Sequence, residues 1–153
     1  MGPPRRASAA GAGDGPGGDG PGWAVVGEHR YDAVAACDVA VVASGTATLE
    51  TALLGVPMVI VYRVNALTYA LARALSDVPH IGMPNLIAGE RVAPELVQGD
   101  CRAPRIAQEV RRILTDPRAA AAIRHGLAGV RSRLGRPGAI PRVAAAAWDM
   151  IGA

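Results

Sequence analysis

Apolar runs and stretches of helical periodicity alternate along residues 23–153 of the chain. Three apolar runs have the length of strands, namely residues 24–26, 39–43 and 58–62. The two segments between them have helical periodicity, at residues 31–37 and 46–54. The run at 39–43 has no polar position, so we expect a strand buried on both faces. Strands and helices in this order are typical of a parallel sheet with right-handed crossovers.

Further helices are predicted in the second half of the chain. One apolar face is spaced for a helix and consists of Leu67, Ala70, Leu71, Ala74 and Leu75. A Pro- and Gly-rich stretch follows, with a possible strand at 80–82 and a turn of helix at 85–88. Three final helices begin near Pro104, Pro117 and Gly138, and Asp116 is the expected N-cap of the second. Their expected inward residues are Ile106, Val110, Ile113, Leu114, Ile123, Leu127, Val130, Leu134, Val143, Ala146, Ala147, Met150 and Ile151.

The Gly and Pro content divides the chain into a tail and one folded domain. Residues 1–22 hold 8 Gly and 4 Pro and almost no large apolar side chain, so we expect them to be disordered. Residues 23–153 are expected to fold as a single α/β domain with a short parallel sheet followed by carboxyl-terminal helices.

Composition excludes several classes of function. All 16 basic residues are Arg, which excludes a phosphate-binding loop built on a lysine. The chain has no Phe and few other aromatic residues, which argues against a nucleic-acid partner bound by base stacking. Cys37 and Cys101 lack metal-site or CxxC spacing, so we expect no metal, no cofactor and a reduced, cytoplasmic setting.

Residues 101–143 carry ten Arg against two acidic residues. Such a basic region can indicate an anionic partner such as phospholipid or nucleic acid. It can equally be a set of solvated helix faces in an Arg-rich chain, which we consider the simpler interpretation.

The candidate chemistry lies where the second predicted strand meets a helix, at Ser44, Gly45 and Thr46. The carboxyl edge of a parallel sheet is where such folds bind ligands, and a helix N-terminus there attracts anions. Thr48 adds a further hydroxyl, while Glu50 could accept hydrogen bonds from a ribose diol. Arg63 follows the next strand and could pair with a diphosphate. The alternative is an ordinary helix start with a capped first turn and a surface arginine.

Four blocks resemble the carboxyl-terminal part of the lipid-A-disaccharide synthase family, whose members are inverting glycosyltransferases of the GT-B type. The blocks are SGTATLETALLGVPMVIVYRV (44–64), LTYALARAL (67–75), MPNLIAGERVAPELVQ (83–98) and RLGRPGA (133–139). The resemblance implies a partial Rossmann-like domain that binds the nucleotide sugar. It also implies transfer of 2,3-diacylglucosamine from its UDP derivative to 2,3-diacylglucosamine 1-phosphate, giving the lipid A disaccharide 1-phosphate and UDP without a metal.

The resemblance assigns roles residue by residue. Ser44, Gly45 and Thr46 would meet the diphosphate and Glu50 the ribose. Asn85 and Arg63 would lie around the donor phosphates or sugar, and Gln98 would close the site; Asn85 and Gln98 enter on the resemblance alone.

Family members are more than twice as long, and their amino-terminal half supplies the acceptor cleft and the expected general base. We therefore expect an incomplete donor half with little activity alone. The alternative is a non-catalytic UDP or UDP-sugar binding module that partners a separate amino-terminal half. The Arg-rich helices would suit peripheral contact with anionic lipid at the inner face of the cytoplasmic membrane.

Overall fold

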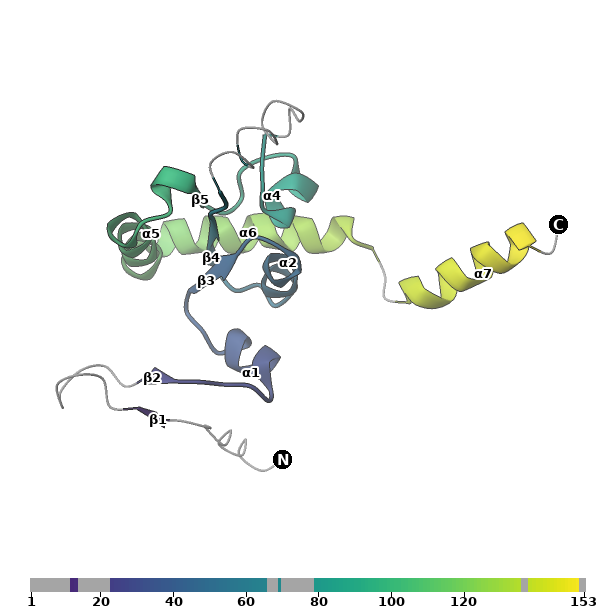
Figure 1. Ribbon diagram of the computed structural model, residues 1–153, viewed down its shortest axis with the longest axis horizontal. Coiled ribbons are helices and arrows are strands. Elements are labelled where there is room, and N and C mark those ends of the chain that lie inside the picture. Colours follow the sequence, from purple (N-terminus) through teal and green to yellow (C-terminus); the bar gives the residue numbers. More distant parts are fainter. Residues whose placement is uncertain (1–11, 14–22, 66–68, 70–78, 136–137, 152–153) are drawn as a thin grey trace.

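A three-stranded parallel sheet with the strand order β3-β4-β5 forms the centre of the molecule (Figure 1). Its strands are β3 (Ala40–Ala43), β4 (Met58–Tyr62) and β5 (Glu95–Val97). The computed structural model describes residues 12–13, 23–65, 69, 79–135 and 138–151. The predicted α/β fold with a short parallel sheet flanked by helices is confirmed.

The central strand β4 is buried because it has a neighbour on each side. Met58, Val59 and Ile60 are at most 1% exposed. In β3, by contrast, exposure alternates and Val41 is 49% exposed. The expectation that this strand is buried on both faces is therefore wrong: β3 is the outer strand of the described sheet, and one of its faces is only partly covered by the described residues.

Two of the predicted strands do not join the parallel sheet. In place of the run at 24–26, the short strand β2 (Trp23–Ala24) pairs antiparallel with β1 (Ala12–Gly13), and Val25 and Val26 are exposed. The possible strand at 80–82 is a loop, because the amides of Ile81 and Gly82 donate to the Glu95 carboxylate instead of to a neighbouring strand. The third strand of the sheet is β5, which lies in a stretch that the sequence pattern assigned to loops.

Six α-helices and one short 3-10 helix (η1, Gln98–Asp100) are bounded within the described ranges. The α-helices are α1 (Arg30–Ala35), α2 (Thr46–Leu53), α4 (Met83–Ala88), α5 (Ala103–Thr115), α6 (Pro117–Arg133) and α7 (Ala139–Ile151). The predicted helix face at 67–75 and nearly all of the predicted tail lie outside the described residues.

The main core lies between the sheet and the helices α2, α5 and α6. Helix α5 packs on one side of the sheet, α2 and α4 lie on the other, and α6 runs past both (Figure 1). The fully buried side chains of this core include Leu127 of α6 and Leu96 of β5. The expected cap of α6 is confirmed, since the Asp116 carboxylate accepts the Arg118 amide. Ile113 was expected to face inward and is buried, but Leu114 and Leu134, expected to do the same, are 55% and 39% exposed. Leu134 lies beyond the end of α6.

Helix α7 stands apart from the body of the molecule (Figure 1). It contains no buried residue, so its predicted inward positions, Val143, Met150 and Ile151 among them, are exposed. The sequence pattern identified an apolar face correctly, but the described residues provide nothing for that face to pack against. No helix in the described part of the chain combines the length and the apolar character needed to cross a membrane.

The turn between β3 and α2 depends on a glycine. Gly45, the N-cap residue of α2, has φ 147° and ψ −164°, a region of backbone conformation open almost only to glycine. A Cβ atom at this position would meet no atom within 4 Å. Glycine is therefore required here by the backbone conformation and not by space.

We expect Gly45→Ala to lower the free energy of unfolding by about 1–3 kcal/mol, because alanine would be held in a strained conformation. The matched control is Gly129→Ala, an exposed position in the last third of α6 with equally open surroundings. It should raise the stability by about 0.5–1 kcal/mol, since alanine favours the helix. Urea denaturation followed by circular dichroism measures both. A Gly45→Ala variant as stable as the parent would contradict this account of the turn.

Candidate functional site

The turn from Ser44 to Thr46 lies at the carboxyl edge of the sheet, as predicted. The Ser44 amide donates to the Val61 carbonyl at 2.9 Å, which joins the end of β3 to β4. The Ser44 hydroxyl donates to the Ile81 carbonyl at 3.0 Å, so its proton is already used by the protein. Gly45 and Thr46 are exposed. An anion at this turn would therefore meet backbone amides and the Thr46 hydroxyl before the Ser44 proton.

Thr48 is buried beneath the same turn. Its hydroxyl donates to the Gly45 carbonyl at 2.7 Å, and its side chain has no exposed surface. The Thr48 amide also donates to Gly45, at 3.0 Å. Thr48 thus stabilises the first turn of α2 on its buried side. The first amides of the helix, by contrast, have no carbonyl partner one turn earlier. That combination leaves a helix N-terminus of the kind that binds anions.

Arg63 and Gln98 border one shallow hollow of about 480 Å³ at the same edge. The Gln98 side chain is engaged with the backbone of Val64: its Oε1 accepts the Val64 amide at 2.8 Å and its Nε2 donates to the Val64 carbonyl at 3.0 Å. This double contact continues the pairing of β4 and β5 beyond their last residues. Gln98 holds a left-handed backbone conformation with φ 49°. Arg63, next to Val64, is exposed. The hollow is lined by Arg63, Val64, Asn65, Gln98 and Gly99.

Asn85 has no exposed surface, and its side-chain amide makes four hydrogen bonds. Its Oδ1 accepts the amides of Val92 and Ala93, both at 2.9 Å. Its Nδ2 donates to the Ala93 carbonyl and to the Glu95 carboxylate, both at 2.8 Å. The structure thus places this predicted site residue in the interior, where it joins α4 to the residues at the start of β5.

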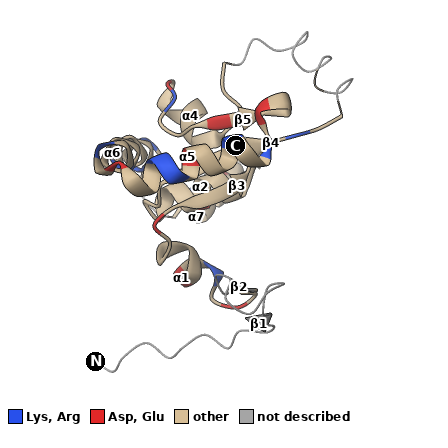
Figure 2. Ribbon diagram, turned by 90° about the vertical axis from the view of Figure 1, so that its left-hand side faces the viewer, with Lys and Arg blue, Asp and Glu red and all other residues tan. Residues whose placement is uncertain are grey.

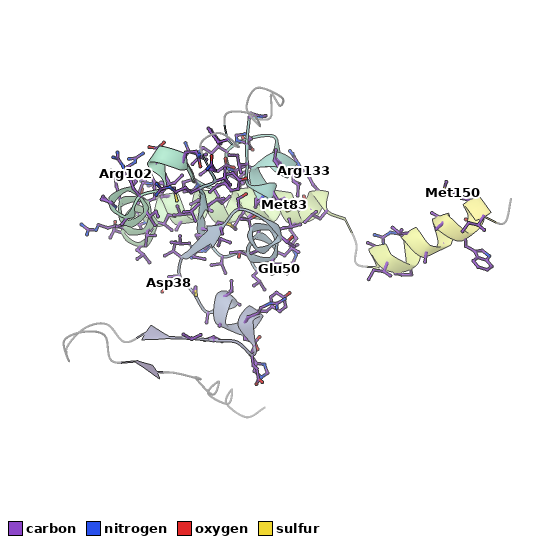
Figure 3. All side chains as sticks on the ribbon, in the orientation of Figure 1. Asp38, Glu50, Met83, Arg102, Arg133 and Met150 are labelled. Atoms are coloured by element: carbon purple, nitrogen blue, oxygen red, sulfur yellow. The ribbon has the colours of Figure 1, made fainter. Side chains whose placement is uncertain are left out.

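Glu50 faces helix α1 from one turn inside α2 (Figure 3). Its Oε1 accepts the Tyr31 hydroxyl at 3.1 Å and lies 3.9 Å from the Arg30 guanidinium. Arg30 donates to the Tyr31 hydroxyl at 2.8 Å, and this hydrogen bond, together with the Glu50 charge, raises the pKa of Arg30. These residues border an apolar groove of about 250 Å³ between α1, β3 and α2. The Glu50 side chain is 37% exposed, so it remains open to a ligand.

The predicted residues therefore separate into three groups. Ser44, Gly45, Thr46 and Arg63 share the exposed edge, since the strands that they follow are neighbours with Ala43 opposite Val61. Glu50 lies one turn further along α2, where its side chain contacts Tyr31 of α1. The remaining three, Thr48, Asn85 and Gln98, are engaged in internal hydrogen bonds.

Sequence reasoning did not identify Tyr31 and Glu95. Tyr31 contacts Glu50, and the Glu95 carboxylate accepts three N–H groups around the loop before α4. An acidic residue inside the apolar run APELV was the available signal for Glu95, because a charge that enters a strand needs partners. Nothing comparable marked Tyr31.

Another hollow, of about 510 Å³, lies elsewhere, between α5, α6 and the residues before β5. It contains none of the predicted site residues. Pro94 and Ala93 line it directly ahead of β5, so it opens at the amino side of the sheet, away from the edge where parallel sheets bind ligands. Within the described ranges no cluster of three His, Cys, Asp or Glu side chains could hold a metal, and the thiols of Cys37 and Cys101 are free.

Comparisons with known proteins identify the family of this chain. The family model for lipid-A-disaccharide synthetase matches residues 23–137. The chain is 50% identical over 133 residues to a lipid-A-disaccharide synthase of Syntrophus aciditrophicus, an alignment that covers 87% of this chain and 35% of the relative. It is 50% identical over 125 residues to the synthase of Geobacter sulfurreducens, covering 82% and 33%.

A more distant relative, the synthase of Gluconobacter oxydans, is 44% identical over 121 residues, which cover 79% of this chain and 29% of the relative. The chain therefore spans about a third of the length of the curated relatives it matches. The resemblance inferred from the four sequence blocks is confirmed, and the chain belongs to the lipid-A-disaccharide synthase family.

Proposed function

We propose that this chain is the donor-binding part of a glycosyltransferase of lipid A biosynthesis. The observation that carries the proposal is the turn Ser44-Gly45-Thr46, with Gly45 and Thr46 exposed, at the carboxyl edge of a parallel sheet beside Arg63. A helix N-terminus and an arginine at one edge form a site for a diphosphate. Membership of the family makes a UDP-activated sugar the natural source of that diphosphate.

The proposed reaction transfers 2,3-diacylglucosamine from its UDP derivative to 2,3-diacylglucosamine 1-phosphate. Its products are the β-1,6-linked lipid A disaccharide 1-phosphate and UDP. In this proposal the amides of the Gly45 turn and Arg63 stabilise the negative charge that develops on the UDP leaving group. Glu50 accepts the ribose hydroxyls. Thr48, Asn85 and Gln98 act indirectly, by holding the turn, the loop before α4 and the backbone next to Arg63.

The acceptor site and the general base are proposed to come from the part of a synthase that this chain does not span. Group transfer requires donor, acceptor and base to be held together in one geometry. The described residues contain a candidate diphosphate site and, further along α2, a candidate ribose ligand. We therefore infer that the chain binds the donor by itself but transfers sugar only together with an amino-terminal part.

A second candidate function is a UDP-sugar binding module that works with a separately produced amino-terminal half. The outer strand β3 favours it. Val41 on this strand is 49% exposed, and a groove of about 250 Å³ lies beside it. An outer strand with unpaired backbone groups and an apolar surface is a ready place for another chain to pair.

We also propose that α5 and α6 touch an anionic membrane surface, where an acylated donor and acceptor would lie. Figure 2 marks the basic positions of these helices in blue. The exposed arginines of these helices, together with Arg102 at the N-cap of α5, are Arg102, Arg111, Arg112, Arg118, Arg124, Arg131 and Arg133. Each such residue near an anionic surface adds about 1 kcal/mol of attraction.

The proposed ribose contact predicts a selective loss in Glu50→Gln. We expect the parent chain to bind UDP more tightly than 2′-deoxy-UDP by calorimetry. The substitution should weaken UDP binding about tenfold, because it removes a charged acceptor. It should weaken binding of 2′-deoxy-UDP less, because that nucleotide keeps only the 3′-hydroxyl. Glu28→Gln, an exposed acidic position outside the groove, is the matched control. An unchanged preference for UDP in Glu50→Gln would refute the assignment.

The proposed need for an amino-terminal part can be tested in a transfer assay with radiolabelled donor. We expect no turnover from the chain alone and turnover after addition of the separately produced amino-terminal part of the Syntrophus aciditrophicus synthase. Turnover restored by that separate part would also favour the second candidate, whereas UDP binding without turnover in any mixture would contradict the pairing with an amino-terminal half. Turnover from the chain alone, near that of a full-length synthase, would overturn the inference that an amino-terminal part is needed.

Membrane contact through the arginines predicts salt-dependent binding to vesicles. We expect binding to vesicles that contain phosphatidylglycerol, measured by sedimentation, to fall sharply between about 0.05 and 0.5 M salt, since salt screens exposed charges. Replacing Arg111 and Arg118 together by Gln should weaken it, whereas Arg30→Gln on α1 should not. Binding that ignores salt, or that is equal on neutral vesicles, would contradict an electrostatic contact.

A further inference from the structure

Glu95 gathers three hydrogen-bond donors at the start of β5. Its Oε1 accepts the Gly82 amide and the Asn85 Nδ2, both at 2.8 Å. Its Oε2 accepts the Ile81 amide at 3.0 Å. Glu95 itself is fixed by the pairing of β5 with β4, where it lies opposite Ile60. One carboxylate therefore ties the loop before α4 to the sheet.

The same loop supports the turn at the edge. Ile81 donates its amide to Glu95 and accepts the Ser44 hydroxyl with its carbonyl. Ser44 in turn donates its amide to Val61 of β4. A continuous series of hydrogen bonds thus runs from the Glu95 carboxylate through one residue of the loop to the first residue of the Ser44-Gly45-Thr46 turn.

The close packing around Gly82 leaves the loop little freedom. A Cβ atom at Gly82 would lie 2.4 Å from the Ile60 Cδ1 and 3.1 Å from the Glu95 Oε1. The loop is therefore pressed against β4 on one side and against the Glu95 carboxylate on the other. A change in what Glu95 accepts must alter the position of Ile81.

Capping of α4 does not account for the whole arrangement. Gly82 is the N-cap residue of this helix, and the Glu95 Oε1 alone accepts both the Gly82 amide and the Asn85 Nδ2. The Ile81 amide precedes the cap, so the bond from Oε2 contributes nothing to the helix end. Its structural consequence lies on the other side of Ile81, at Ser44.

We propose that Glu95 is a positioning residue for the diphosphate of the donor: through Ile81 it holds the Ser44 hydroxyl and thereby the backbone amides of the turn. This inference rests on the proposed function for its ligand. Its structural part, the coupling of Glu95 to Ser44, does not depend on which ligand binds. Pre-ordered amides bind an anion without having to be rearranged, so loss of the coupling lowers affinity for the phosphates.

The substitution Glu95→Gln separates the two oxygens. A glutamine can keep its carbonyl oxygen at the Oε1 position, where it still accepts Gly82 and Asn85. Its NH₂ group then faces the Ile81 amide, and a donor cannot bond to a donor. The variant therefore releases Ile81 while the cap of α4 is kept.

We expect Glu95→Gln to weaken UDP binding about fivefold and to leave the affinity for uridine, which has no phosphates, unchanged in calorimetry. Ser44→Ala should cause a similar loss, and the double variant should lose little more than either single one, because both break the same series of contacts. Glu90→Gln, an exposed acidic position on the segment between α4 and β5, is the matched control and should bind as the parent does. Equal losses for UDP and uridine, or additive losses in the double variant, would overturn the proposal.

Amide resonances provide a measurement that does not need UDP. In ¹H–¹⁵N spectra, Glu95→Gln should shift the resonances of Gly45 and Thr46, and Ser44→Ala should shift that of Ile81. If the parent chain binds no UDP, the proposed function is wrong, but these shifts still show whether Glu95 is coupled to Ser44. Should Glu95→Gln not fold, the Ser44→Ala spectrum alone decides it, and an unmoved Ile81 resonance refutes the proposal.

Discussion

Asn85 makes four hydrogen bonds from a position with no exposed surface, and the carboxyl edge of the sheet depends on them. A buried amide is tolerated only when its groups are all paired, because each unpaired one would keep its full desolvation penalty. The pairing in turn requires Glu95, the residues before β5 and helix α4 to keep one arrangement. The loop that reaches Ser44 is carried by that same arrangement, so a fully buried side chain sets the geometry of an exposed turn.

The edge is prepared for an anion mainly by its backbone. The chain has no lysine, and the cation that follows β4 at the edge is Arg63. Glycine at the start of α2 exposes amides, and Thr48 closes the turn from below. Helix α4 is held at its other end by Arg133 of α6, whose guanidinium donates to the carbonyls of Ile87 and Ala88 (Figure 3). The two ends of α4 are thereby held in place, one by Glu95 and the other by Arg133.

The strand β4, the turn after β3 and the capped start of α6 could be predicted from the sequence because each depends on neighbouring residues. The exposure of Val41 could not, since an apolar run does not tell which strand is outermost. Nor could β5, whose three residues follow a proline in a stretch rich in turn formers. The role of Glu95 depends on amides more than ten residues away, and no local spacing indicates such a contact.

The order of the strands along the chain has a consequence for folding. β3 and β4 are joined by a short connection through α2, whereas β5 follows β4 only after a long excursion that contains α4. Closing the longer loop costs more conformational entropy, so the unit of β3, α2 and β4 gains stable contacts first. Glu95 arrives with β5, and the surroundings of Ser44 are therefore completed late. Local opening of β5 would dismantle them while the earlier unit stays folded.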